Sequence, residues 1–239
     1  MMQKRLPFSI WAPLAAVVFT LLLGAGYLLV PLPPNIDASG GAVLSWMQTH
    51  KQALRMQAWL SMVAWLPGGA LFALTYARMR GAAAGAFVLG TSLLLALVSC
   101  GALLRLGAAR HAETLSPQLA RVFMDLEAHW GTLATIATVL QSAGLCRSIV
   151  EGRFPRWLLP IVSGFALQQL IETVTIVGDG PWLAPGGALN HLGANLYAVW
   201  VLSLGMATGM ATGLPSRTPS TTPATPAQEP PGFADQPWR

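Results

Sequence analysis

The residues that most readily suggest chemistry lie inside an apolar stretch, Trp157–Val177, which reads WLLPIVSGFALQQLIETVTIV. Gln168, Gln169 and Glu172 interrupt a run that is otherwise long and apolar enough to cross a lipid bilayer. A carboxylate at that depth is costly, so it should face other helices or a water-filled pocket. Glu172 is therefore the first candidate for a functional side chain, and the other segments are expected to surround it.

Two roles for Glu172 need no metal ion. In the first, the carboxylate is structural and joins helices through hydrogen bonds or ion pairs. The partners considered for this role are His191, Asn195, Gln141 and Arg55. In the second, Glu172 titrates within a pathway for a small solute or for protons, with His191 as its neighbour. The other pathway residues would be Asn195, Gln168 and Gln141. The structural role is preferred.

A third role is a metal site, which would use Asp125, His129, Glu172 and His191. Imidazole and carboxylate groups suit zinc, although these four residues lie on three expected helices. The chain contains no HExxH or HxxEH motif, no GxSxG nucleophile motif and no glycine-rich phosphate loop. We therefore expect a membrane protein without catalysis and without a bound cofactor, whose polar cluster near the outer leaflet is structural.

The composition indicates that lipid surrounds most of the chain. Of 239 residues, 54% are hydrophobic and only 10% are charged, whereas soluble domains carry about 25% charged residues. The net charge of +5 would suggest a nucleic-acid partner in a soluble chain. Here the basic residues lie at the ends of apolar runs, so the expected partner is the lipid bilayer and not nucleic acid.

Hydropathy predicts an all-α bundle of about six membrane spans within residues 1–213. The expected spans are 8–30, 56–77, 82–104, 130–146, 157–177 and 188–213, each long enough to cross about 30 Å of hydrocarbon. Two short amphipathic helices are expected before the second and fourth spans, at Gly41–Arg55 and from Ser116-Pro117 onward. Residues 214–239 are rich in proline, serine and threonine, which predicts a disordered tail.

Several glycines predict how the helices pack. Pro67-Gly68-Gly69 should kink or break the second span at its middle. The pairs Gly81/Gly85 and Ala86/Gly90 place small residues four apart, which lets helix backbones approach closely. The sixth span carries a GxxxGxxxG series, which could serve packing within one chain or between two copies in a homo-oligomer. The glycines of that series are Gly205, Gly209 and Gly213.

The distribution of basic residues predicts the orientation. Six crossings place both termini on one side, which receives nine lysines and arginines against five on the other. By the positive-inside rule this favours both termini, and hence the tail, in the cytoplasm. All four histidines then lie toward the outer face. Glu172 and His191 would lie at similar depths near that face, on adjacent helices.

Two stretches carry a resemblance to known proteins. The segment HKQALRMQAWLSMVAWLPGGALFALTYARMR, from His50, and FPRWLLPIVSG, from Phe154, resemble small bacterial integral membrane proteins of about six spans. These proteins form a domain-of-unknown-function family without an assigned activity. The resemblance covers roughly residues 5–212 and implies a bacterial cytoplasmic membrane. It implies no catalytic residues.

Overall fold

A computed structural model describes residues 8–35, 37–176, 182 and 188–211. The predicted tail, 214–239, lies outside these residues. The described elements are α1 (Phe8–Leu29), α2 (Gly40–Tyr76), α3 (Gly81–Arg110), α4 (Pro117–Val150), α5 (Leu158–Glu172), the 3-10 helix η1 (Thr173–Ile176) and α6 (Ala188–Met210).

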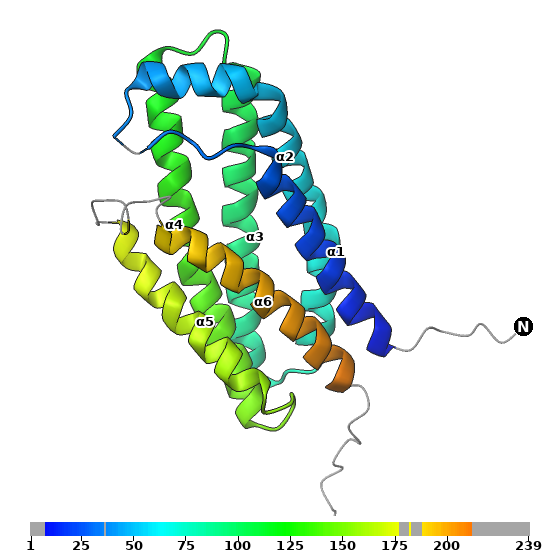
Figure 1. The fold of residues 1–239 in the computed structure, drawn as a ribbon. Coiled ribbons are helices and arrows are strands. Elements are labelled where there is room, and N and C mark those ends of the chain that lie inside the picture. The colour runs from blue at the N-terminus through cyan, green and yellow to red at the C-terminus, as the bar shows by residue number, and fades with distance from the viewer. Residues whose placement is uncertain (1–7, 36, 177–181, 183–187, 212–239) are drawn as a thin grey trace, which may run out of the picture.

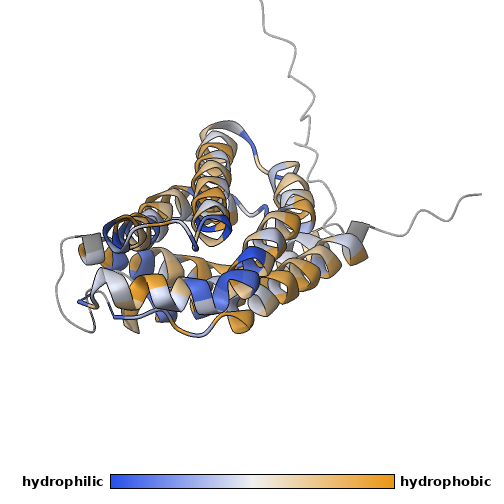
Figure 2. Cartoon of the chain, turned by 90° about the horizontal axis from the view of Figure 1, so that it is seen from above, coloured by the Kyte–Doolittle hydropathy of each residue, from blue (hydrophilic) through white to orange (hydrophobic). Residues whose placement is uncertain are grey.

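The predicted all-α fold class is confirmed. No strand occurs among the described residues, and six of their helices are long and apolar enough to span a membrane. Figure 1 shows these helices side by side, with the start of α1 at the lower end. Seen from above, their surfaces are mainly hydrophobic, and hydrophilic residues are concentrated at the upper end (Figure 2). The chain is therefore a multi-pass membrane protein.

The helix α2 joins two segments that were expected to be separate. The predicted amphipathic helix and the second span form one continuous helix, which Ser39 caps by accepting a hydrogen bond from the Ala42 amide at 3.3 Å. Its first part lies across the upper end of the bundle before the helix turns downward beside α1 (Figure 1). That first part buries Val43 and Met47 in a small hydrophobic cluster with the end of α3 and the start of α4.

Of the kink or break expected at Pro67-Gly68-Gly69, a break is wrong, because helical structure continues through these residues. Gly68 instead provides room for α1. A Cβ atom at this position would lie 2.8 Å from the ring of Phe19, so only glycine permits the present contact. The small residue thus brings α1 against α2 and does not interrupt the helix.

The antiparallel pair α3 and α4 makes the most extensive helix contact. The start of α4 is as predicted, with the Ser116 hydroxyl accepting from the Leu119 amide at 3.2 Å and Pro117 in the first turn. The glycines that allow the close approach are Gly90 and Gly144. A Cβ on either would lie 2.5 Å from backbone of the opposite helix, at Gln141 N and Ala83 O respectively.

The small-residue prediction for this pair is therefore only partly correct. Gly90 lies in the interface, but Gly81 and Gly85 are exposed and a Cβ on either would meet nothing within 4 Å. Gly81 serves the tight turn from α2 instead, where its φ of +55° is unfavourable for residues with a Cβ.

The first and last helices pack together through the predicted glycine series. A Cβ on Gly205 would lie 3.0 Å from the Ala12 carbonyl oxygen and would overlap the side chain of Ala16. Gly205 is therefore used for packing against α1 within the chain, which is one of the two alternatives that the sequence left open. Gly209 is also buried in α6, and Gly213 lies outside the described residues.

Candidate functional site

The upper half of the bundle contains a buried polar cluster that we name the Glu172 cluster. It consists of Thr138 from α4, Gln168, Gln169 and Glu172 from α5, and Asn190 from α6. The Glu172 side chain is 5% exposed, so the carboxylate lies inside the protein and does not contact lipid. The prediction that it faces other helices is therefore correct.

Three amide groups donate hydrogen bonds to the Glu172 carboxylate. Gln168 Nε2 and Gln169 Nε2 lie 2.6 and 2.9 Å from Oε2, and Asn190 Nδ2 lies 2.5 Å from Oε1. Hydrogen bonds to an ionised acceptor are roughly twice as strong as those between neutral groups. Both oxygens have partners, which offsets the cost of burying a carboxylate at this depth.

The cluster connects three helices. Gln169 Nε2 also donates to Gln168 Oε1 at 2.7 Å, and Thr138 Oγ1 donates to Gln169 Oε1 at 2.7 Å. Asn190 closes the cluster from α6, three residues before Gly193. A Cβ on Gly193 would lie 3.0 Å from both glutamine Nε2 atoms and would overlap Glu172 Oε2. Glycine at 193 is therefore what lets α6 cover the carboxylate.

His191 does not join this cluster, so the expected Glu172–His191 pair is wrong. Its Nδ1 lies 2.5 Å from the hydroxyl oxygen of Tyr27 on α1. Asn195 Nδ2 donates to the His191 carbonyl oxygen at 2.8 Å, one turn along the same helix. His191 follows Asn190 directly, and neighbouring helical residues point about 100° apart, so the two side chains contact different helices.

Gln141 is also separate from Glu172. It is fully buried, and its Nε2 donates to the Thr91 hydroxyl on α3 at 2.8 Å. Its Oε1 has no hydrogen-bond partner among the described residues. Gln141 therefore contributes to the α3–α4 contact beside Gly90, and it is not part of a pathway through Glu172.

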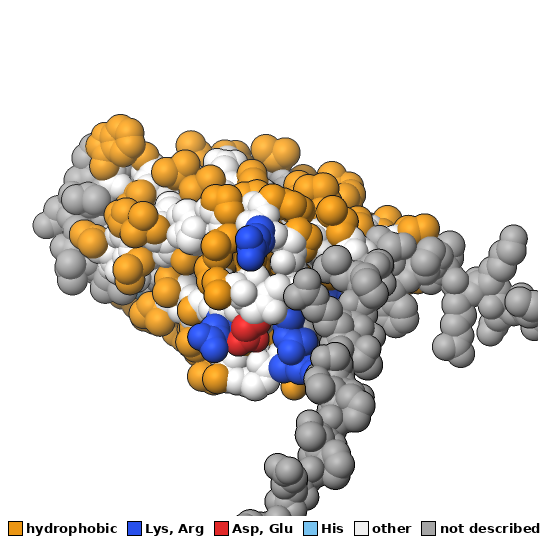
Figure 3. Space-filling view, turned by 90° about the horizontal axis from the view of Figure 1, so that it is seen from below, with side chains coloured by type: hydrophobic (Ala, Val, Ile, Leu, Met, Phe, Trp, Pro, Cys, Tyr) orange, Lys and Arg blue, Asp and Glu red, His pale blue; other side chains and the backbone are white. Residues whose placement is uncertain are grey.

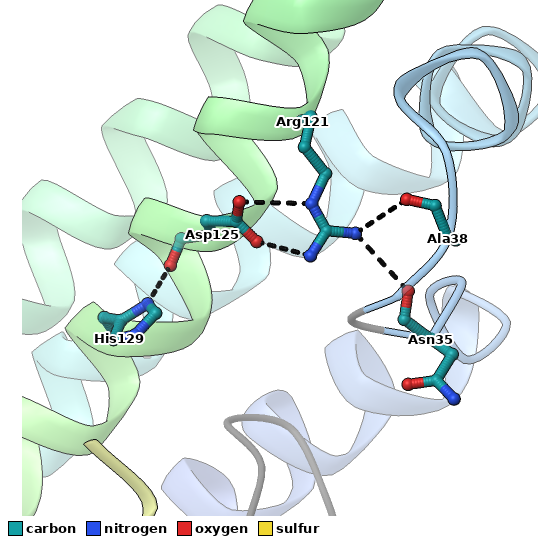
Figure 4. Close-up of polar contacts among 5 residues, drawn as sticks. All are labelled: Asn35, Ala38, Arg121, Asp125 and His129. Atoms are coloured by element: carbon teal, nitrogen blue, oxygen red, sulfur yellow. Dashed lines mark hydrogen bonds and ion pairs between the residues drawn. The ribbon is translucent and has the colours of Figure 1, made fainter. Parts of the chain in front are cut away.

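The four residues of the predicted metal site are not arranged as metal ligands. Both oxygens of Asp125 accept from Arg121, at 2.7 and 3.1 Å, and His129 Nδ1 donates to the Asp125 carbonyl oxygen at 2.7 Å (Figure 4). Glu172 and His191 have the other partners given above. No group of three histidine, cysteine, aspartate or glutamate side chains suited to a metal ion occurs in the part of the chain that the structure describes.

Arg121 has a second role at the upper end. Its Nη1 donates to the carbonyl oxygens of Ala38 at 3.0 Å and of Asn35 at 3.4 Å (Figure 4). These contacts tie the segment between α1 and α2 to α4. The ion pair between Arg121 and Asp125, one turn apart on α4, therefore holds the guanidinium group in place to bind that segment.

A cavity that the sequence did not indicate lies between α1, α2 and α6, below the first part of α2. Its volume is about 720 Å³. Apolar and aromatic side chains form most of its wall, among them Phe19, Leu23, Tyr197 and Val201. Polar side chains reach it from several helices, among them Arg105 of α3, Glu127 of α4, Gln57 of α2, and His191 and Asn195 of α6. The residues were missed because they are scattered along the chain without a motif.

Three polar atoms in the wall of this cavity have no hydrogen-bond partner among the described residues. They are Thr20 Oγ1, Trp46 Nε1 and Tyr197 Oη. Each can donate a hydrogen bond, and leaving a buried donor unpaired costs about 1–3 kcal/mol. These three atoms are shielded from solvent, so the polar groups that a ligand could reach are the partly exposed side chains of the lining, such as Arg105 and Glu127. The cavity therefore has the features of a ligand site: concave, mainly apolar, with few polar groups.

The chain matches no family model, no curated protein and no solved structure.

Proposed function

We propose that this chain is a membrane protein that binds a small amphipathic molecule in the cavity between α1, α2 and α6. The observation that carries the proposal is the cavity itself, about 720 Å³ in volume, with a mainly apolar and aromatic wall and a few polar side chains in its lining. Drug-sized molecules and cofactors occupy cavities of about 300–1,000 Å³, so a ligand of that size fits.

In this proposal Glu172 is structural. Three amide donors already occupy its two oxygens, and Gly193 of α6 covers it. A group that releases and accepts protons during transport needs access to water, whereas this side chain is enclosed. The arrangement therefore favours a fixed connection between α5 and α6 over a proton pathway.

Filling the cavity tests the binding proposal. Gly24 lines the cavity, and a Cβ on it would meet nothing within 4 Å, so a larger side chain can begin there without a clash. We expect Gly24→Phe to lower the amount of lipid or other amphiphile that co-purifies with the protein in mild detergent by about tenfold. Mass spectrometry of the extracted small molecules, relative to protein, measures this amount.

Gly164→Phe is the matched control, because Gly164 is exposed on α5 and equally open but does not line the cavity. It should retain the wild-type amount. Ala198→Phe fills the cavity from α6 and should act like Gly24→Phe. Equal retention by the wild type and both filled variants would show that the cavity is not a binding site.

We further propose that both termini face the cytoplasm of a bacterial cell. The described residues place five lysines and arginines at each end of the bundle. In the lower group Arg147 and Arg153 pair with Glu151, and Figure 3 shows basic side chains on either side of an acidic one on the face seen from below. The excess on the lower side comes from Lys4 and Arg5 directly before α1, and from two arginines in the tail. Charges close to the first span carry most weight.

Reporter fusions test this orientation. Green fluorescent protein fused after Arg239 should fluoresce, and alkaline phosphatase fused there should be inactive. The same reporters inserted at Trp182, between α5 and α6, should give the opposite result. An active phosphatase after Arg239 would reverse the proposed orientation.

A further inference from the structure

The cavity is divided along its length into a polar end and an apolar end. Arg105 and Glu127 lie near the upper ends of α3 and α4, whereas Phe19 and Val201 lie deeper, toward the middle of α1 and α6. From Leu28 at the top of α1 to Phe19 the helix descends about 13 Å. A molecule that fills the cavity therefore meets the charged pair at one end and mainly apolar and aromatic side chains at the other.

The charged end holds an ion pair in which one donor nitrogen and one acceptor oxygen are left without a hydrogen bond. Arg105 Nε donates to Glu127 Oε1 at 2.7 Å, and Arg105 Nη2 donates to the same oxygen. Arg105 Nη1 and Glu127 Oε2 have no partner among the described residues. Both side chains are about one quarter exposed, so they remain accessible. A free cationic donor thus lies beside a free anionic acceptor.

The charge balance selects the kind of head group that fits. Arg105 and Glu127 supply the only Lys, Arg, Asp or Glu side chains among the lining residues, so their charges cancel. A purely anionic group would be attracted to Arg105 but repelled by Glu127. A purely cationic group would be attracted to Glu127 but repelled by Arg105. A head group with both charges can bind Nη1 with its anionic part and Oε2 with its cationic part.

The rim of the cavity indicates that the ligand comes from the bilayer. Leu28 and Leu32 are part of the lining and are 84% and 68% exposed. Exposed leucines on a membrane-spanning helix and its end are suited to contact with lipid and not with water. These leucines therefore give the cavity an apolar rim that an acyl chain of the bilayer can contact.

We propose that the cavity binds a zwitterionic lipid, with its head group on the Arg105–Glu127 pair and its chain beside Phe19 and Val201. This inference rests on the proposed function, since it names the ligand class for the same cavity. Phosphatidylethanolamine is the probe, because its phosphate and ammonium groups match Nη1 and Oε2. Phosphatidylglycerol, which has the phosphate but no cation, is the comparison.

The test measures binding of each lipid to the full chain by native mass spectrometry in detergent micelles of defined lipid content. The wild type should bind phosphatidylethanolamine about tenfold better than phosphatidylglycerol. Glu127→Gln leaves Arg105 without its counter-charge, so this variant should reverse the preference and bind phosphatidylglycerol better. Arg105→Gln/Glu127→Gln removes both charges and should bind both lipids weakly, without a preference.

Glu113→Gln is the matched control. Glu113 forms an exposed ion pair with Lys51 at the same end of the bundle, at 2.5 Å, and does not line the cavity. It should keep the wild-type preference. The unfolding temperature of each variant shows whether it is folded. If Glu127→Gln is not folded, the Arg105→Gln/Glu127→Gln variant tests the proposal in its place.

The possible outcomes separate the two proposals. If Gly24→Phe displaces lipid but the Glu127→Gln and double variants keep the wild-type preference, the ligand class is wrong and the binding site stands. If Gly24→Phe displaces nothing, the binding site itself is wrong. If free phosphoethanolamine at millimolar concentration displaces the lipid as well as intact phosphatidylethanolamine does, the ligand is a water-soluble solute, which overturns the bilayer origin.

Discussion

Gly90→Leu is expected to cause the largest loss of stability of any single exchange considered for this protein. A Cβ at residue 90 would lie 2.5 Å from Gln141 N and 2.7 Å from Ala137 O, and both are backbone atoms of α4. These backbone atoms cannot move aside as a side chain can by changing its rotamer, so α3 and α4 would have to separate to make room for the new side chain. Overpacking of a core costs about 1–3 kcal/mol where side chains can adjust, and we expect at least the upper value here.

The separation would also break the hydrogen bond between Gln141 and Thr91, since the two residues lie in the same contact. The measurement is the unfolding temperature in detergent. Gly85→Leu is the control on the same helix, because Gly85 is exposed and a Cβ there meets nothing within 4 Å. Equal unfolding temperatures for the two variants would contradict the close α3–α4 contact.

Glu172→Leu is expected to destabilise the protein strongly, although it removes a charge from the membrane-spanning region. An isolated carboxylate in hydrocarbon costs about 2.5–3.5 kcal/mol, so its replacement by leucine would stabilise a protein in which Glu172 lacked partners. Here the amides of Gln168, Gln169 and Asn190 would each lose a charged acceptor, and only part of that loss is offset, because Gln169 keeps its bond to Gln168 Oε1 and Gln168 keeps a long one to the Leu189 carbonyl oxygen. Losing a hydrogen bond to a charged group costs about 1.5–3 kcal/mol. The sign of the effect therefore decides whether the cluster is structural.

Glu172→Gln should fall between the wild type and Glu172→Leu, because it keeps one acceptor oxygen but presents a donor in place of the other. Ser163→Leu is the control on α5. Ser163 is exposed, and its hydroxyl donates only to carbonyl oxygens of its own helix, so the exchange should leave the unfolding temperature nearly unchanged. Loss of pH-dependent solute uptake in liposomes by a stable Glu172→Gln variant would support the transport alternative instead.

The helices and the burial of Glu172 could be predicted because each depends on local sequence. Long apolar runs require helical backbone in lipid, since a helix satisfies its own amide groups. Ser116-Pro117 marks a helix start by its own hydrogen bond and fixed φ. A carboxylate in such a run must face protein, and Glu172 does.

The partners of Glu172 could not be predicted, because they depend on how each helix is rotated about its axis. Depth alone placed His191 beside Glu172, yet its neighbour Asn190 makes the contact and His191 reaches Tyr27. The same limitation explains why Gly85 was expected in a helix contact and is exposed. The cavity depends on the relative tilt of α1, α2 and α6, which no spacing in the sequence records.

The contact between α1 and α6 has a consequence for biosynthesis. Gly205 of α6 packs against Ala12 and Ala16 of α1, so the two surfaces that meet are synthesised nearly 200 residues apart. Contacts of such high sequence separation form late, because a long chain must be ordered first. After insertion α1 can pack against α2 at once, but the cavity wall that α6 supplies is complete only when α6 has left the translocon.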